Sequence, residues 1–429
     1  MSMKNEDEFN LLEEIRKKEK IENPYQRFCL TSNPFPKSAI ADLASESFFS
    51  GCRKNALARI KEFLVYAYKS QRWAGLIVKG EYGSGKSHLL YFVTNEVNRQ
   101  LGTLSKDRAL TIYIESPKNS VNDLYEDFIK KLGREYFENQ VANVIGETIE
   151  EVFKDKPRQY LLLPLEKETS MDLISRLRAL GKGLNLSVKN DGYNDLAKRL
   201  SSAGFVQQQD FAKCLGILLC DDSQETRDAA WKFCIGESLS KSEAKELRLV
   251  SESLSEDEIV RYAFPSVIGI LNKNGIAMIF LLVDELEKIA ARPRPKAFEF
   301  LENLRSLVDN NLEHLAMIFA CVTEAWDVLS SISPGLSERM SEVADLDPLD
   351  NPDAGVLIKD YLRKTRITSY SGEDLFPFGE DAVEEINRFS RGSIRFILQN
   401  CYLVLERAAS NKSIKDRINA EFAGKVLKG

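Results

Sequence analysis

The strongest structural signal in this 429-residue chain is the segment Gly80-Glu81-Tyr82-Gly83-Ser84-Gly85-Lys86-Ser87. It follows a short apolar run at 74–78 and precedes a helical pattern over 88–99. The stretch fits G-x-x-x-x-G-K-[ST] in every fixed position, and a strand before it with a helix after it is the context that this motif requires. The glycines allow consecutive backbone N–H groups to surround phosphate oxygens, and the helix N-terminus adds its positive dipole end. The match therefore indicates a phosphate-binding loop rather than an ordinary glycine-rich turn.

The loop side chains have separable expected roles. Lys86 would contact the β- and γ-phosphates of a bound nucleotide, and the Ser87 hydroxyl would ligate Mg²⁺. We expect His88 to be a helix-face residue and Tyr82 to pack against neighbouring backbone without chemistry of its own. The candidate nucleotide-binding residues are Gly80, Glu81, Tyr82, Gly83, Ser84, Gly85, Lys86, Ser87 and His88.

Two adjacent carboxylates follow the most apolar run of the chain, 279–283. A buried parallel strand delivers its last residues to the carboxyl edge of the sheet, where the phosphate loop is also expected. There Asp284 would orient Mg²⁺, and Glu285 would polarise the attacking water as general base. Acidic residues are also common at solvated strand ends, but the upstream loop favours the functional interpretation.

Two further candidates lie downstream. Thr323 follows the apolar run 316–322, and its hydroxyl would hold the attacking water. A threonine that ends a strand without any function is nearly as compatible with this pattern. Arg339 precedes a strand candidate at 343–346. It would either reach the γ-phosphate of an adjacent subunit or pair with Glu338 or Glu342.

Basic residues also begin a helix near the end of the chain, in the segment Arg391-Gly392-Ser393-Ile394-Arg395. Arg395 would point toward the nucleotide, or it would be an ordinary solvated arginine. Arg391 would equally contact a partner or nucleic acid.

Composition narrows the class of protein. The chain has 59 Lys+Arg, 65 Asp+Glu and a net charge of −6, which argues against a protein coated with basic charge for wrapping nucleic acid but permits a local basic patch. Its two histidines leave little room for a histidine metal site or a Ser/His/Asp triad, and its seven scattered cysteines include no Cys-x-x-Cys pair. The charged N-terminus lacks a signal-peptide core, and the longest apolar run, 276–283, is shorter than the ~20 residues that span a bilayer. We therefore expect a cytoplasmic protein without membrane contact.

Strand and helix patterns alternate along most of the chain, which predicts an α/β fold with a parallel sheet flanked by helices. We expect an N-terminal leader at 1–30, a core at 31–345 with a helical insertion at about 140–265, and a C-terminal α-helical lid at 346–429. Lys86 and Asp284 are 284 − 86 = 198 residues apart, and this long separation is what predicts the insertion.

In order along the chain, these motifs resemble an AAA+ P-loop ATPase. The upstream segments Asn33-Pro34-Phe35-Pro36 and Phe48-Phe49-Ser50-Gly51-Cys52-Arg53 resemble the base-contacting segment of the Orc/Cdc6-like and transposition-helper-like groups. The phosphate loop together with Trp231-Lys232-Phe233-Cys234-Ile235-Gly236-Glu237-Ser238 is similar to ATP-binding proteins of BREX-type phage-defence systems, the BrxD/BrxC-like group.

The resemblance implies ATP and Mg²⁺ as cofactors, ATP hydrolysis, a homo-oligomer, and other proteins of the same system as partners in a DNA-linked process. The alternative is a nucleotide-dependent switch or scaffold that recruits partner proteins with little hydrolysis. Direct DNA contact would come from 388–395 or from the insertion.

Overall fold

The computed structural model describes residues 23–38, 53–154, 170–182, 186–310, 313–340, 342–411, 414 and 417–429. Most of the expected leader and the segment 48–52 lie outside these residues. The chain divides into two compact units. The first contains residues 1–57, 80–88 and 346–429, and the second contains residues 58–79 and 89–345.

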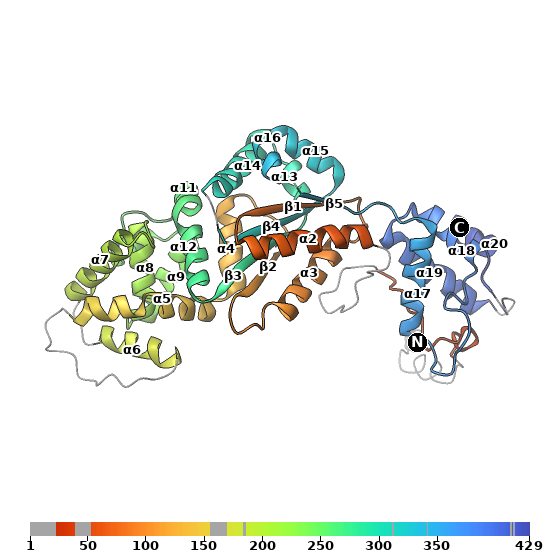
Figure 1. Ribbon diagram of the computed structural model, residues 1–429, viewed down its shortest axis with the longest axis horizontal. Helices are drawn as coiled ribbons and strands as arrows, with labels where there is room; N and C mark the ends of the chain where they lie inside the picture. The colour runs from red at the N-terminus through yellow and green to blue at the C-terminus, as the bar shows by residue number, and fades with distance from the viewer. Residues whose placement is uncertain are drawn as a thin grey trace, which may run out of the picture. The chain divides into compact units, whose positions relative to one another are not determined.

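The second unit is built on a five-stranded parallel sheet with the order β2-β3-β4-β1-β5 (Figure 1). The strands are β1 Ala74–Lys79, β2 Arg108–Ile114, β3 Ile276–Val283, β4 Leu315–Cys321 and β5 Glu342–Asp345. Every residue of β3 and β4 is buried, as in a sheet covered on both faces. The predicted α/β fold is confirmed.

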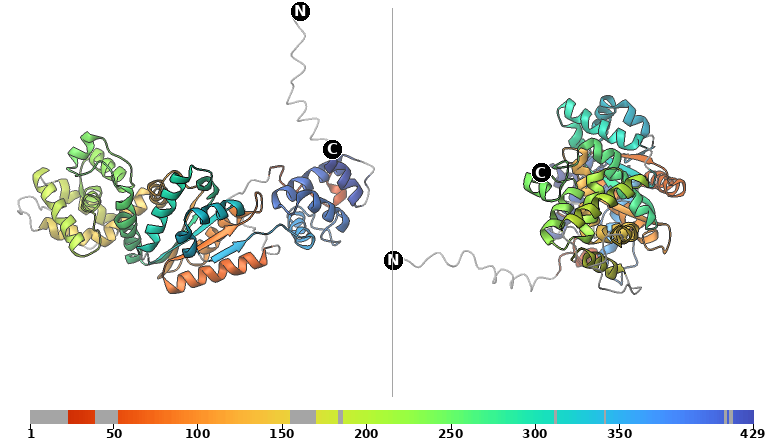
Figure 2. Two further views of the ribbon diagram at one scale, coloured as in Figure 1. Left: turned by 90° about the horizontal axis from the view of Figure 1, so that it is seen from above. Right: turned by 90° about the vertical axis from the view of Figure 1, so that its left-hand side faces the viewer.

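Alternate strand residues face opposite layers of helices. Ile77, Leu281 and Phe319 belong to one apolar core with α4 (Val121–Leu132), α12 (Phe264–Lys273) and α14 (Arg294–Asp309). The opposite face is covered by α2 (Lys54–Ser70), which runs along the sheet in Figures 1 and 2, and by α3 (Lys86–Gln100). Thr111 on β2 hydrogen-bonds to Asn98 of α3 at 2.6 Å, which fixes α3 to that face.

The described residues between β2 and β3 form helices and no strand, from α4 through α12. The additional elements are α5 Arg134–Lys154, α6 Ser170–Lys182, α7 Leu186–Ser202, α8 Gln209–Cys220, α9 Gln224–Cys234, α10 Lys241–Glu246, α11 Glu256–Glu258 and the π-helical turn Ile259–Ala263. Their apolar side chains continue the core of the sheet, and the buried Tyr125 hydroxyl of α4 donates to the carbonyl of Cys234 at 2.8 Å. The insertion therefore shares its core with the sheet.

Three short helices follow the ends of β3 and β4. They are α13 Glu287–Ala290, α15 Thr323–Ile332 and α16 Pro334–Arg339. In the described part of the chain, we find no helix that combines the length and apolarity needed to cross a bilayer.

The first unit has a separate core built on residues 346–429, which we call the lid. Its helices are α17 Asn351–Lys364, α18 Glu380–Ser390, α19 Ile394–Ser410 and α20 Ala420–Lys428. The upstream segment with the short 3₁₀ helix Gln26–Phe28 packs into this core. Phe35 stacks on Tyr361 with ring centroids 5.8 Å apart, so the proline-broken segment 33–36 is anchored to the lid.

Candidate active site

The loop that follows β1 turns at two glycines. Gly83 and Gly85 have φ values of +78° and +98°, in the left-handed region that glycine adopts without strain. The α3 helix begins at Lys86, directly after the loop. Strand, loop and helix follow one another as the sequence predicts.

The Lys86 side chain folds back over the loop. Its Nζ donates to the carbonyl oxygens of Gly80 at 2.7 Å and Glu81 at 3.2 Å, and the residue is 8% exposed. The Tyr82 ring centroid lies 5.6 Å from the same Nζ. Tyr82 is 65% exposed, so the expectation that it packs against neighbouring backbone is wrong. The ammonium is thus held at the loop by acceptors that phosphate oxygens can replace.

Arg53 stabilises the phosphate loop by hydrogen bonds to backbone carbonyls. The sequence alone did not predict this role. The buried Arg53 guanidinium donates through Nη2 to the Ser84 carbonyl at 3.0 Å and through Nη1 to the carbonyl of Asp347, just after β5. The Ser84 hydroxyl is buried and has no hydrogen-bond partner among the described residues. Arg53 therefore joins the phosphate loop to the segment that leads into the lid.

The lid contacts the loop at the start of α19. The Arg395 backbone N–H donates to the Gly83 carbonyl at 3.1 Å, and the Ser393 hydroxyl donates to the Tyr82 carbonyl at 3.5 Å. The Arg395 side chain is exposed. Within this unit the structure brings together the loop, Arg53 and Arg395.

Substituting Gly83 by alanine is expected to release this contact. A Cβ there would lie 2.7 Å from the Ser393 hydroxyl and 2.8 Å from the Arg395 Cβ. Loss of the backbone bond should make the amide of Arg395 exchange with solvent about tenfold faster, which hydrogen-exchange mass spectrometry measures. Gly204→Ala is the matched control, because Gly204 has φ +69° but nothing within 4 Å of a Cβ. Equal protection of Arg395 in both variants would contradict the contact.

In the second unit, Asp284 follows β3 as a buried carboxylate. It is 2% exposed, its Oδ1 accepts from the Glu285 N–H at 2.8 Å, and its Oδ2 accepts from the Tyr113 hydroxyl at 3.1 Å. It makes no ion pair with any described residue. A buried carboxylate without a cation is costly, so this position favours binding of a positive ion.

The oxygen atoms of Asp284 and Ser87 are of the type that Mg²⁺ prefers. Among the described residues no cluster of three or more His, Cys, Asp or Glu can hold a metal. Mg²⁺ in nucleotide sites is usually held by one or two protein oxygens together with substrate phosphates, rather than by such a cluster. The Asp284 carboxylate and the Ser87 hydroxyl are each oxygen donors of the type that Mg²⁺ prefers.

Glu285 adopts a backbone conformation that is rare for its residue type. Its φ is +52°, in the left-handed region, where non-glycine residues cluster at functional sites. Its carboxylate is half exposed and pairs with Lys288 Nζ at 2.5 Å. The general-base candidate is therefore accessible to water, in contrast to the buried Asp284.

Thr323 and Arg339 lie in the same unit as the carboxylates. Strand β4 is adjacent to β3, and the Leu286 N–H donates to the Ala320 carbonyl at 3.0 Å, so Thr323 follows the strand next to Asp284. Thr323 is the first residue of α15 and makes no hydrogen bond to either carboxylate within the described ranges.

Arg339 pairs with neither of the two glutamates considered from the sequence. Its guanidinium forms an ion pair with Asp309, and its Nη1 donates to the carbonyl of Gly335 at 2.6 Å. Its side chain stays about one-third exposed.

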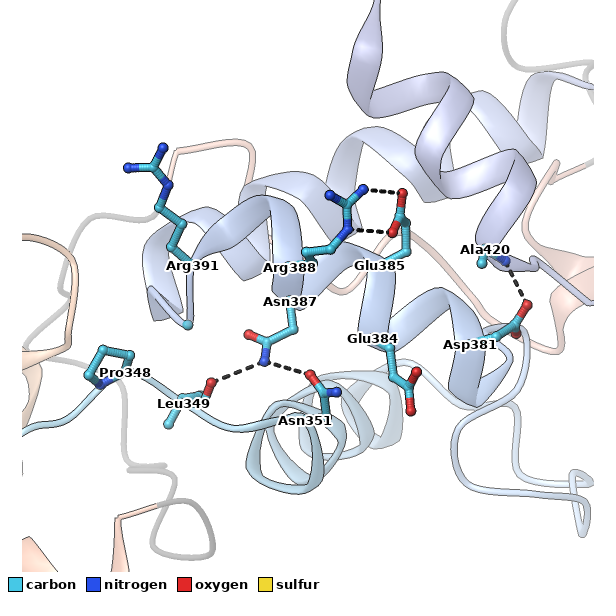
Figure 3. Close-up of a pocket in the computed structure, with 11 residues that line it drawn as sticks. Pro348, Leu349, Asn351, Asp381, Glu384, Glu385, Asn387, Arg388, Arg391 and Ala420 are labelled. Carbon is cyan, nitrogen blue, oxygen red and sulfur yellow. Dashed lines mark hydrogen bonds and ion pairs between the residues drawn. The ribbon is translucent and has the colours of Figure 1, made fainter.

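A pocket of about 570 Å³ lies in the lid and is drawn in Figure 3. Asn387 donates to the Leu349 carbonyl at 3.0 Å and to Asn351 Oδ1 at 2.9 Å, which fastens the segment after β5 to α18. The Arg388 guanidinium donates to both carboxylate oxygens of Glu385. The Arg391 side chain points away from Arg388 and Glu385 (Figure 3). Of the basic residues in 388–395, Arg388 is thus already paired.

The strand order, the glycine-rich loop after β1 and the Asp-Glu pair after β3 define a P-loop fold of the AAA+ class. The chain belongs to the BrxC/BrxD family, because the family model described as "BREX system ATP-binding protein BrxC/D" matches residues 53–369. The resemblance identified from the sequence is confirmed.

Solved structures with a similar arrangement come from several organisms. The Aeropyrum pernix ORC2 protein is 9% identical, with a TM-score of 0.41. The match covers 88% of this chain and 67% of the ORC2 chain. The Aeropyrum pernix ORC1 protein in complex with DNA has 11% identity and a TM-score of 0.40, covering 95% and 69%. The Drosophila ORC bound to DNA has 11% identity and a TM-score of 0.41, covering 100% and 69%. No curated protein matches the chain.

Proposed function

We propose that this chain binds ATP at Gly80–Ser87 and hydrolyses it to ADP and phosphate with Mg²⁺, through Asp284 and Glu285. The proposal rests on the contrast between the two carboxylates that follow β3, Asp284 and Glu285. Asp284 is buried and has no ion pair among the described residues, and it is followed directly by an accessible Glu285 in a strained backbone conformation. One carboxylate is thereby suited to a cation and the other to a water molecule.

Each candidate residue has a defined task in this proposal. The loop N–H groups and Lys86 bind and orient the phosphates, and Lys86 exchanges the Gly80 and Glu81 carbonyls for phosphate oxygens. Ser87 and Asp284 would hold Mg²⁺, which supplies positive charge against the phosphate oxygens. Glu285 accepts the proton of the attacking water, and Thr323 orients that water. Arg395 contributes positive charge from the lid.

Phosphate release by the purified chain, measured with ATP in the presence and absence of Mg²⁺, tests the proposal. We expect turnover that requires Mg²⁺. Tight nucleotide binding without turnover at any protein concentration would contradict hydrolysis and support the alternative, in which the contact between Gly83 and Arg395 makes the lid a nucleotide-dependent switch.

We further propose that the chain works as an oligomeric motor or switch with other proteins of a BREX-type defence system, in a DNA-linked process in the cytoplasm. The family membership supports the defence role, and the net charge of −6 favours protein partners over broad DNA contact. Local contact with DNA through Arg391 would weaken as salt rises.

Arg339 is the proposed residue that completes the site of an adjacent subunit. The ion pair with Asp309 is partly exposed, and such pairs stabilise by about 1 kcal/mol or less, so the arginine can leave it. Turnover per protomer should rise with protein concentration, and Arg339→Ala should lower the plateau by about 10³-fold or more. Arg305→Ala is the matched control, because Arg305 also pairs with Asp309, at 3.4 Å. Full activity of Arg339→Ala at every concentration would exclude the role.

A further inference from the structure

Tyr113 lies beside Asp284 because β2 and β3 are neighbouring parallel strands. In the register of the pair, Tyr113 is opposite Leu282 and Ile114 is opposite Val283. The Asp284 N–H continues the ladder by donating to the Ile114 carbonyl at 2.9 Å. This pairing fixes the backbone from which both side chains project.

The Tyr113 hydroxyl reaches the carboxylate directly. Its Oη donates to Asp284 Oδ2 at 3.1 Å, while the Glu285 N–H donates to Oδ1 at 2.8 Å. Each oxygen thus has one protein donor and retains acceptor capacity, since an ionised carboxylate has about four lone-pair sites. The two donors fix the orientation of a carboxylate that is 2% exposed.

A second tyrosine holds the Tyr113 ring in place. The Tyr91 ring, on α3, lies 4.5 Å from the Tyr113 ring at an interplanar angle of 54° and limits its movement. The packing of the two rings keeps the Tyr113 hydroxyl beside the Asp284 carboxylate.

We propose that Tyr113 is a positioning residue that orients the Asp284 carboxylate for binding of Mg²⁺ with nucleotide. This inference rests on the proposed function, because it assigns Asp284 to the cation. Hydrogen-bond partners of metal-binding side chains orient them, and their loss typically weakens metal affinity by about 10- to 100-fold.

The test is the Mg²⁺ dependence of nucleotide binding, followed with a fluorescent ADP analogue from EDTA to millimolar Mg²⁺. Tyr113→Phe keeps the ring and its packing on Tyr91 and removes only the hydroxyl. We expect the Mg²⁺ concentration for half-maximal enhancement to rise about tenfold or more, with nucleotide affinity in EDTA unchanged.

Tyr125→Phe is the matched control. It also removes one buried tyrosine hydroxyl, which donates to the Cys234 carbonyl at 2.8 Å, and it should leave the Mg²⁺ midpoint unchanged. An unchanged or lower midpoint in Tyr113→Phe would overturn the inference and leave the proposed function intact. Binding that is independent of Mg²⁺ in the unsubstituted protein would instead contradict the proposed function.

Discussion

Replacing Glu285 by glutamine is expected to lower ATP turnover by about 10²- to 10⁴-fold. Glutamine keeps the size of the side chain but cannot accept the proton of the attacking water. The half-exposed Glu285 carboxylate pairs with Lys288, and its proposed partner is the attacking water rather than the phosphates, so ATP affinity should stay within a few-fold of the unsubstituted value. Steady-state phosphate release and equilibrium binding of ATP, measured on the same preparations, check both expectations.

Glu324→Gln is the matched control for this substitution. Glu324 is an exposed carboxylate in the first turn of α15, after the strand next to β3. Its loss should leave turnover unchanged. Equal turnover in Glu285→Gln and the unsubstituted protein would remove Glu285 as the base.

Replacing Lys86 by alanine is expected to weaken nucleotide binding by about 100-fold or more. Hydrogen bonds from a charged donor contribute about 1.5–3 kcal/mol each, and Lys86 would lose more than one such bond to the phosphates. The Lys86 Nζ donates to two loop carbonyls, so the substitution also leaves these acceptors without this donor. Titration with a fluorescent ATP analogue measures the loss.

Lys79→Ala separates this effect from a general loss of positive charge. Lys79 is the last residue of β1, next to the loop, and pairs with Asp345 at 3.4 Å. Its substitution should change nucleotide affinity by less than about threefold, because such a pair contributes little. If both alanine variants bound equally well, Lys86 would not be a phosphate ligand.

Local patterns in the sequence were sufficient to predict the strands of the sheet and the residues that follow them. The apolar runs 74–78 and 279–283 become β1 and β3 because their side chains are buried on both faces. The loop 80–87 and the pair 284–285 directly follow these strands, so their positions along the chain predict where they emerge from the sheet.

Contacts between residues far apart in the sequence were not predictable in the same way. Arg53 reaches the carbonyl of Ser84, and the Tyr113 hydroxyl reaches Asp284, 171 residues away. Both depend on strand order and helix packing, which no local pattern specifies. Glutamate does not favour a left-handed backbone, so the positive φ of Glu285 was likewise not predictable from local propensity. The ion pair of Arg339 with Asp309 also depends on tertiary packing, because it joins the separate helices α16 and α14.

In the proposed function, ATP held by the loop is hydrolysed through Glu285. A single-turnover experiment tests this step: ATP and Mg²⁺ are mixed with excess protein, and the bound nucleotide is identified over time. The unsubstituted protein should convert its bound ATP to ADP, and Glu285→Gln should retain ATP over the same period. Conversion to ADP by Glu285→Gln at the unsubstituted rate would contradict the claim.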